Sequence, residues 1–254
     1  MTSAKLALSL FLTCSLGSLA LTVEANPAAQ TRQPSGAETN RLKVDLDTTG
    51  IAKTTKVEIV KKTPFEPGDE IIQLNGEPMH VRIIFDGKKI DDHDNNNYNR
   101  PHLLIYPLSQ YAALYPADRK VIFNKRISDL KKMIATKSDK GIDSLPIMPD
   151  SDAHEVFHQQ EKYLKFNQGN GVAFISVYSN GDPAMNEGDF FYTFQGLTAD
   201  GKHYVSFFWP VKATGMPANS TEANAEKYVH KLARSKFTPS LDAIDKMVSS
   251  MSIK

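Results

Sequence analysis

One short motif in this sequence carries residue types that suit catalysis. His154, Glu155 and His158 form the pattern His-Glu-x-x-His. On a helix, histidines four residues apart share a face, so both imidazoles can bind one Zn²⁺ while the glutamate activates a bound water. The motif therefore predicts, as an alternative function, a zinc metallopeptidase with Glu155 as its catalytic residue and zinc as its cofactor.

The surroundings of the motif argue against this zinc site. A catalytic zinc needs a third protein ligand, and the nearest carboxylate is Glu161, one turn further along the same expected helix. A short helix over 153–161 would turn Ala153, Val156 and Phe157 inward and would direct both histidines toward solvent. We therefore expect an exposed histidine pair on one helical turn, without a catalytic residue, a metal ion or a cofactor.

Aromatic side chains in two predicted strands form a second candidate site. Phe190, Tyr192 and Phe194 alternate along one face of a strand, and Trp209 ends an apolar run over 204–209. Such side chains can line a ligand pocket or a partner surface, but aromatic residues in strands more often pack in a core. We expect core packing and keep a ligand or partner face as the alternative.

The charge balance excludes several classes of partner. The 254 residues include 30 Lys and Arg and 29 Asp and Glu, which gives a net charge of +1. This balance provides no field that would attract nucleic acid or an anionic membrane. An acidic loop over 91–97 begins like a calcium-binding loop but lacks the later ligands of one. We expect no nucleic-acid partner.

The first 25 residues predict export. Lys5 precedes an apolar run over 6–23, which ends in a small-x-small sequence at 23–25. A charged start, an apolar segment and small residues at the end are typical of a signal peptide, here cleaved near Ala25. The run is too short and too polar for a membrane span, so we expect a periplasmic or secreted mature chain without a transmembrane segment. The only cysteine, Cys14, lies within the apolar run, which continues past it, so lipidation is not expected.

The rest of the chain predicts one folded domain. Residues 26–41 contain no bulky apolar side chain and cannot bury enough surface to order themselves. We therefore expect a signal peptide over 1–25, a flexible leader over 26–41 and a single α+β domain over 42–254.

Hydrophobic periodicity predicts an antiparallel sheet covered by helices. Asn75-Gly76 lies between two β-prone runs, 71–74 and 80–85, which is a strong hairpin signal. A C-terminal meander is expected over 162–166, 172–178, 189–195 and 203–211, with 204–209 as a central strand, and helices are expected over 109–115, 118–137, 221–235 and 239–250. This is the α+β class, and an α/β/α sandwich is one arrangement of it.

Several short motifs follow one another in the C-terminal half. They are Leu145-Pro146, Phe157-His158, Gly169-x-Gly171, FYTFQGLT at 191–198, DGK at 200–202, YVS at 204–206 and Phe237-Thr238-Pro239. In these motifs the chain resembles a family of exported bacterial proteins of unknown function, which implies a bacterial envelope protein but transfers no activity and no catalytic residue. The family pattern contains Phe157-His158 but not His154-Glu155. In its fold, the closing helix with a short tail is similar to the PsbP-like α/β/α sandwich.

The sequence therefore predicts an exported, soluble, non-catalytic binding or accessory protein of the bacterial envelope. Its partner would be an unknown envelope protein or a small ligand. The two alternatives are the zinc metallopeptidase and a carrier of a small ligand.

Overall fold

The computed structural model describes residues 42–68, 72–91, 97–142, 144–181 and 184–254. All of them belong to one compact unit of the chain. The predicted signal peptide and leader, and most of the acidic loop, lie outside the described residues.

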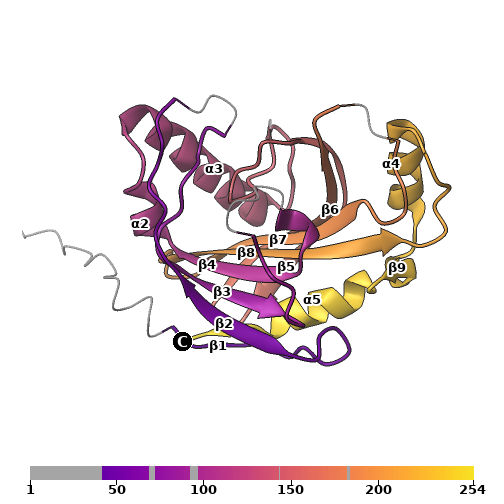
Figure 1. The fold of residues 1–254 in the computed structure, drawn as a ribbon, viewed down its shortest axis with the longest axis horizontal. Coiled ribbons are helices and arrows are strands. Elements are labelled where there is room, and N and C mark those ends of the chain that lie inside the picture. The colour runs from indigo at the N-terminus through magenta and orange to yellow at the C-terminus, as the bar shows by residue number, and fades with distance from the viewer. Residues whose placement is uncertain (1–41, 69–71, 92–96, 143, 182–183) are drawn as a thin grey trace, which may run out of the picture. The chain divides into compact units, whose positions relative to one another are not determined.

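An antiparallel sheet of eight strands forms the centre of this unit (Figure 1). In spatial order its strands are β2 (Thr55–Val60), β3 (His80–Phe85), β4 (His102–Pro107), β8 (His203–Ala213), β7 (Phe190–Thr198), β6 (Gly169–Ser179) and β5 (His154–Phe166), and β9 (Phe237–Thr238) pairs with β8. A small second sheet joins β1 (Val44–Asp45) to β10 (Ser252–Ile253). Strand β8 lies between β4 and β7, which confirms the prediction of a central strand over 204–209.

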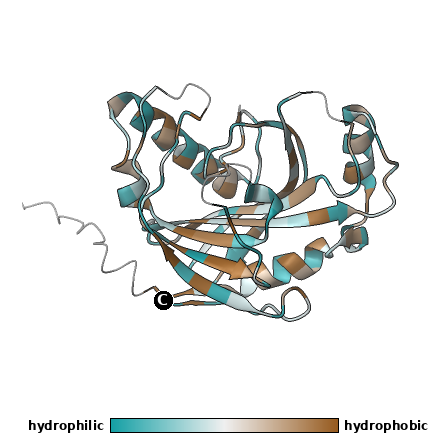
Figure 2. Cartoon of the chain, in the orientation of Figure 1, coloured by the Kyte–Doolittle hydropathy of each residue, from teal (hydrophilic) through white to brown (hydrophobic). Residues whose placement is uncertain are grey.

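Helices pack on the sheet because alternate strand residues give it two apolar faces. One core contains Ala173 and Ile175 of β6 together with side chains of α4 (Glu222–Lys231) and α5 (Leu241–Ser250). The other contains Phe174 of β6 together with side chains of α2 (Leu108–Ala112) and α3 (Ala117–Thr136). Two short 3₁₀ helices, η1 (Asn97–Asn99) and η2 (Arg234–Lys236), complete the elements. Figure 2 shows the hydrophobic residues along the strands, and the arrangement confirms the predicted α+β class.

The predicted hairpin through Asn75-Gly76 is wrong. Strand β3 pairs instead with β2, with Val57 opposite Ile83. The side chain of Asn75 accepts a hydrogen bond from the backbone N–H of Glu66 (2.9 Å), and Gly76 adopts a φ of +80°. The Asn-Gly pair therefore lies within the long β2–β3 connection, where Asn75 is hydrogen-bonded to Glu66, because side-chain hydrogen bonding and positive φ suit many loop positions besides hairpin turns.

The predicted helix over 153–161 is also wrong, because these residues belong to β5. The strand pairs with β6 from His154 opposite Ser179 to Phe166 opposite Gly169. Two register shifts, between Glu155 and Phe157 and between Gln159 and Lys162, each insert one extra residue. Such bulges break the period-two alternation of a strand, and the resulting pattern was mistaken for a helical one.

Glycines allow a close approach between β6 and β7. A Cβ atom on Gly171 would lie 2.4 Å from the carbonyl oxygen of Gln195 and 2.5 Å from Cζ of Phe194. The ring of Phe194 also lies close to Gly196, so the glycines leave the space that this aromatic side chain occupies. Packing here thus depends on the absence of a side chain.

We predict that Gly171→Ala lowers the free energy of unfolding by about 2 kcal/mol or more, because overpacking a tight site forces backbone shifts. Gly188→Ala is the matched control, since a Cβ atom there meets nothing within 4 Å. Urea unfolding of both variants measures the difference. Equal stabilities would contradict the packing argument.

Candidate functional site

Strand β5 separates the residues of the His-Glu-x-x-His motif. His154 is exposed at the start of the strand. Glu155 and His158 are brought onto one face by the bulge between them, and Nδ1 of His158 lies 3.3 Å from a carboxylate oxygen of Glu155. Nε2 of His158 lies 3.1 Å from Asp139 and 3.6 Å from Glu161. The two histidines therefore do not form the helical pair that a zinc peptidase requires.

The charge of His158 also opposes metal binding. Burial lowers its pKa, but the hydrogen bond and charge of Glu155, together with Asp139 and Glu161, outweigh burial and raise the pKa to about 9. A protonated imidazole has no lone pair for a metal ion. Among the residues that the structure describes, no group of three or more His, Cys, Asp or Glu side chains is arranged to hold one.

The aromatic residues considered as a ligand or partner face lie in the core. Phe190, Tyr192, Phe194 and Trp209 are all buried in the cluster that also contains α4 and α5 side chains. The hydroxyl of Tyr192 donates a hydrogen bond to Asp245 (2.9 Å). Their packing is that of a core, as expected from their place in central strands.

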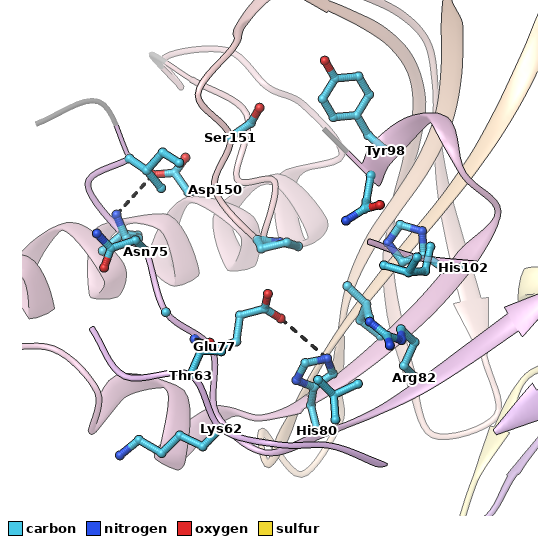
Figure 3. A pocket seen from close by; sticks show the side chains of 18 of the residues that line it. Lys62, Thr63, Asn75, Glu77, His80, Arg82, Tyr98, His102, Asp150 and Ser151 are labelled. Carbon is cyan, nitrogen blue, oxygen red and sulfur yellow. Dashed lines mark hydrogen bonds and ion pairs between the residues drawn. The ribbon is translucent and has the colours of Figure 1, made fainter. Parts of the chain in front are cut away.

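A cavity of about 860 Å³ lies elsewhere, against β2, β3 and β4 (Figure 3). Its floor belongs to the same face of the sheet that α2 and α3 cover. Its walls come from the segments 61–66, 72–77 and 147–151 and from the short helix η1. A cavity of this size is typical of sites for small organic molecules.

The floor of the cavity is polar although the strands that form it are buried. His80 and Arg82 lie two residues apart on one face of β3, and His102 begins β4. The exposed fraction is 1% for His80, 8% for Arg82 and 2% for His102. Arg82 donates two hydrogen bonds, of 3.0 and 3.2 Å, to one carboxylate oxygen of Glu58, which lies opposite it on β2. Figure 3 shows Arg82 beside His102 at this floor.

His80 belongs to a second group of hydrogen-bonded side chains. Its Nδ1 lies 2.9 Å from the carbonyl oxygen of Pro78, and its Nε2 lies 3.5 Å from a carboxylate oxygen of Glu77. The same oxygen accepts a hydrogen bond of 2.5 Å from the hydroxyl of Tyr106. These contacts hold the carboxylate of Glu77 over the floor.

His102 is held by stacking and by one hydrogen bond. Its ring stacks on Phe208 with centroids 5.0 Å apart, and its Nδ1 donates to the carbonyl oxygen of Arg100 (2.8 Å). Burial lowers its pKa to about 4; the hydrogen bond to Arg100 opposes this effect and the charge of Arg82 adds to it. The ring is therefore neutral at physiological pH.

Partly buried hydrogen bonds fix the opposite wall. Asp150 accepts hydrogen bonds from Arg126 of α3 (2.9 Å) and from the backbone N–H of Leu74 (3.3 Å). Arg126 also donates to the carbonyl oxygen of Ile147 (3.2 Å). The ion pair thus joins the helix, the segment 147–151 and the β2–β3 connection, and it holds the wall in place.

This site was not predicted from the sequence. The signal was present in the runs HVRIIF at 80–85 and HLLIYP at 102–107, in which polar residues interrupt otherwise apolar strands. Buried histidine and arginine side chains in such strands need partners, so their presence indicates a role other than core packing. The walls come from distant segments, and no periodic pattern links those segments to the strands.

Comparisons of the chain with protein-family models, with curated proteins and with solved structures found no match. In the described part of the chain, no helix has the length and apolar character needed to cross a membrane. Any functional conclusion therefore depends on the geometry of the cavity.

The environment of His158 predicts a pH dependence of stability. Its folded pKa of about 9 lies above the ordinary value of 6.5, so its contribution is fully present below pH 6.5 and is lost as pH rises through 9. We expect the wild-type protein to lose stability over this window relative to His158→Gln, as measured by urea unfolding at several pH values.

His154→Gln is the matched control, because His154 is exposed on the same strand. This variant should follow the wild-type pH profile. Parallel profiles for the wild type and His158→Gln would show that the carboxylates do not hold the proton on His158.

Proposed function

We propose that this chain is a non-catalytic binding protein that holds a small polar organic molecule in the cavity between β2–β4 and the segments 61–66, 72–77 and 147–151. The observation that carries the proposal is the buried polar floor formed by His80, Arg82 and His102. Burying polar groups costs free energy, and an apolar floor would serve the fold alone equally well.

The state of the ionisable groups supports binding over catalysis. The carboxylates of Glu58, Glu77 and Asp150 accept hydrogen bonds from Arg82, Tyr106 and Arg126 respectively. Groups fixed in this way are suited to orienting a bound molecule. Burial lowers the pKa of His102 to about 4, so this imidazole is neutral and is not suited to proton transfer near neutral pH.

We further propose that the protein is exported to the bacterial envelope. The support is the charged, apolar and small-residue order of 1–25 and the resemblance of the C-terminal motifs to exported proteins. The mass of the mature chain, measured in the native envelope fraction, tests the proposal: loss of residues 1–25 supports it, and an intact N-terminus contradicts it. The prediction of an envelope protein as partner stays a prediction.

A bulky residue in the cavity tests the proposed binding. Val60 of β2 lines the cavity, whereas Val57 of the same strand is 55% exposed and does not. We expect that members of a library of water-soluble metabolites raise the melting temperature of the wild type and of Val57→Trp, but not that of Val60→Trp. Ligand that binds only the folded state stabilises it by mass action, and differential scanning fluorimetry measures the shift.

Two outcomes would contradict the proposal. The first is a wild-type protein that no compound in the library stabilises. The second is equal stabilisation of both tryptophan variants, which would place the binding site outside this cavity.

A further inference from the structure

One ring nitrogen at the floor of the cavity indicates what the ligand must offer. His102 is almost fully buried, and its Nδ1 lies against the carbonyl oxygen of Arg100. Because a carbonyl oxygen only accepts hydrogen bonds, Nδ1 carries the proton and Nε2 presents a lone pair. No residue in the described ranges donates a hydrogen bond to Nε2. His102 lines the cavity, and its Nε2 is not among the buried atoms that lack a partner, so a donor from a bound molecule can reach this acceptor.

Neighbouring charges restrict the kind of donor. The positive charge of Arg82 acts on the ring of His102 and disfavours its protonation. The same charge would repel a cationic amine placed at Nε2. An anionic group would be repelled by the lone pair of Nε2 and by the carboxylates of Glu58 and Glu77, which line the same cavity. A neutral donor avoids both conflicts.

The charged pairs around the cavity favour a neutral molecule as a whole. Glu58 pairs with Arg82 (3.0 Å), and Asp150 pairs with Arg126 (2.9 Å). Figure 3 shows the side chain of Lys62 extending away from Arg82 and His102. A charged ligand would compete for these partly buried pairs, and separating their partners would cost free energy. A neutral ligand leaves them intact.

We propose that the cavity binds a neutral polyhydroxylated compound, a sugar or a polyol, and that Nε2 of His102 accepts a hydrogen bond from one of its hydroxyl groups. This inference rests on the function proposed above. Hydroxyl groups both donate and accept, so they match a lining that contains the carboxylate of Glu77 and the hydroxyl of Ser151. The rings of Tyr98 and Tyr178, 5.3 Å apart, add aromatic surface at the cavity for the apolar face of a sugar ring.

Three sets of probes on the wild-type chain test the ligand class. They are neutral mono- and disaccharides with linear polyols, anionic sugar phosphates with uronic acids, and cationic amino sugars with polyamines. We expect the neutral set alone to contain compounds that raise the melting temperature and bind in isothermal titration calorimetry. Stabilisation by only an anionic or a cationic set would overturn the inference and leave the proposed function standing. Stabilisation by other metabolites but by none of the three sets would also overturn the inference and leave the proposed function standing. No response to any compound would overturn both the inference and the proposed function.

Two substitutions at one position test the role of Nε2. His102→Leu removes the acceptor, whereas His102→Gln provides an amide oxygen that can accept a hydrogen bond; both lose the stacking on Phe208. We expect His102→Leu to bind the best neutral probe about tenfold more weakly than His102→Gln, as one lost hydrogen bond implies. Equal affinities would overturn the role of Nε2. Circular dichroism checks folding, and if either variant is unfolded the comparison of the probe sets on the wild type decides the ligand class.

Discussion

A buried hydrogen-bond network centred on Gln195 holds the sheet and the cavity wall together. The side-chain amide of Gln195 donates to Thr193 (2.7 Å) and to Ser206 (3.0 Å), and its oxygen lies 2.5 Å from the hydroxyl of Tyr204. That hydroxyl also lies 2.6 Å from the carbonyl oxygen of Pro146, and Ser206 donates to the carbonyl oxygen of Met148. Because these atoms are buried, breaking one bond would leave a partner unsatisfied. The segment that follows Met148 is therefore anchored where it can form the wall of the cavity.

This anchoring explains how a polar cavity exists on an otherwise apolar face. Further along the face, α2 and α3 cover Tyr106, Phe174 and Tyr204 with apolar side chains. Over β2 and β3 the cover consists of connecting segments, which carry their own backbone polar groups and need partners for them. Arg126 and Asp150 satisfy part of that need by joining α3 to the wall. A polar floor under these segments thus fits the architecture.

The predictability of each region follows from how local its signal is. The strands β6, β7 and β8 were predicted because each is a run of apolar and β-prone residues, and because a short turn with Gly201 joins β7 to β8. The first part of β5, residues 154–161, was not, since two bulges hide its alternation and Gln160 takes a φ of +66° there. The side-chain amide of Gln160 donates hydrogen bonds to the carbonyl oxygens of Val229 and Leu232 at the end of α4. A contact between positions so far apart in sequence leaves no periodic trace.

The two candidate sites also differ in how local their sequence signal is. The His-Glu-x-x-His motif is a local pattern, and its chemistry depends on a helix that β5 does not provide. The cavity has no local pattern, because Glu58, Arg82 and His102 meet only through the pairing of β2, β3 and β4. Placing a cation and two imidazoles beneath connecting segments lowers stability relative to an apolar floor. Proteins retain such costs chiefly where binding or activity requires them, so the buried polar floor is a stronger indication of function than the motif.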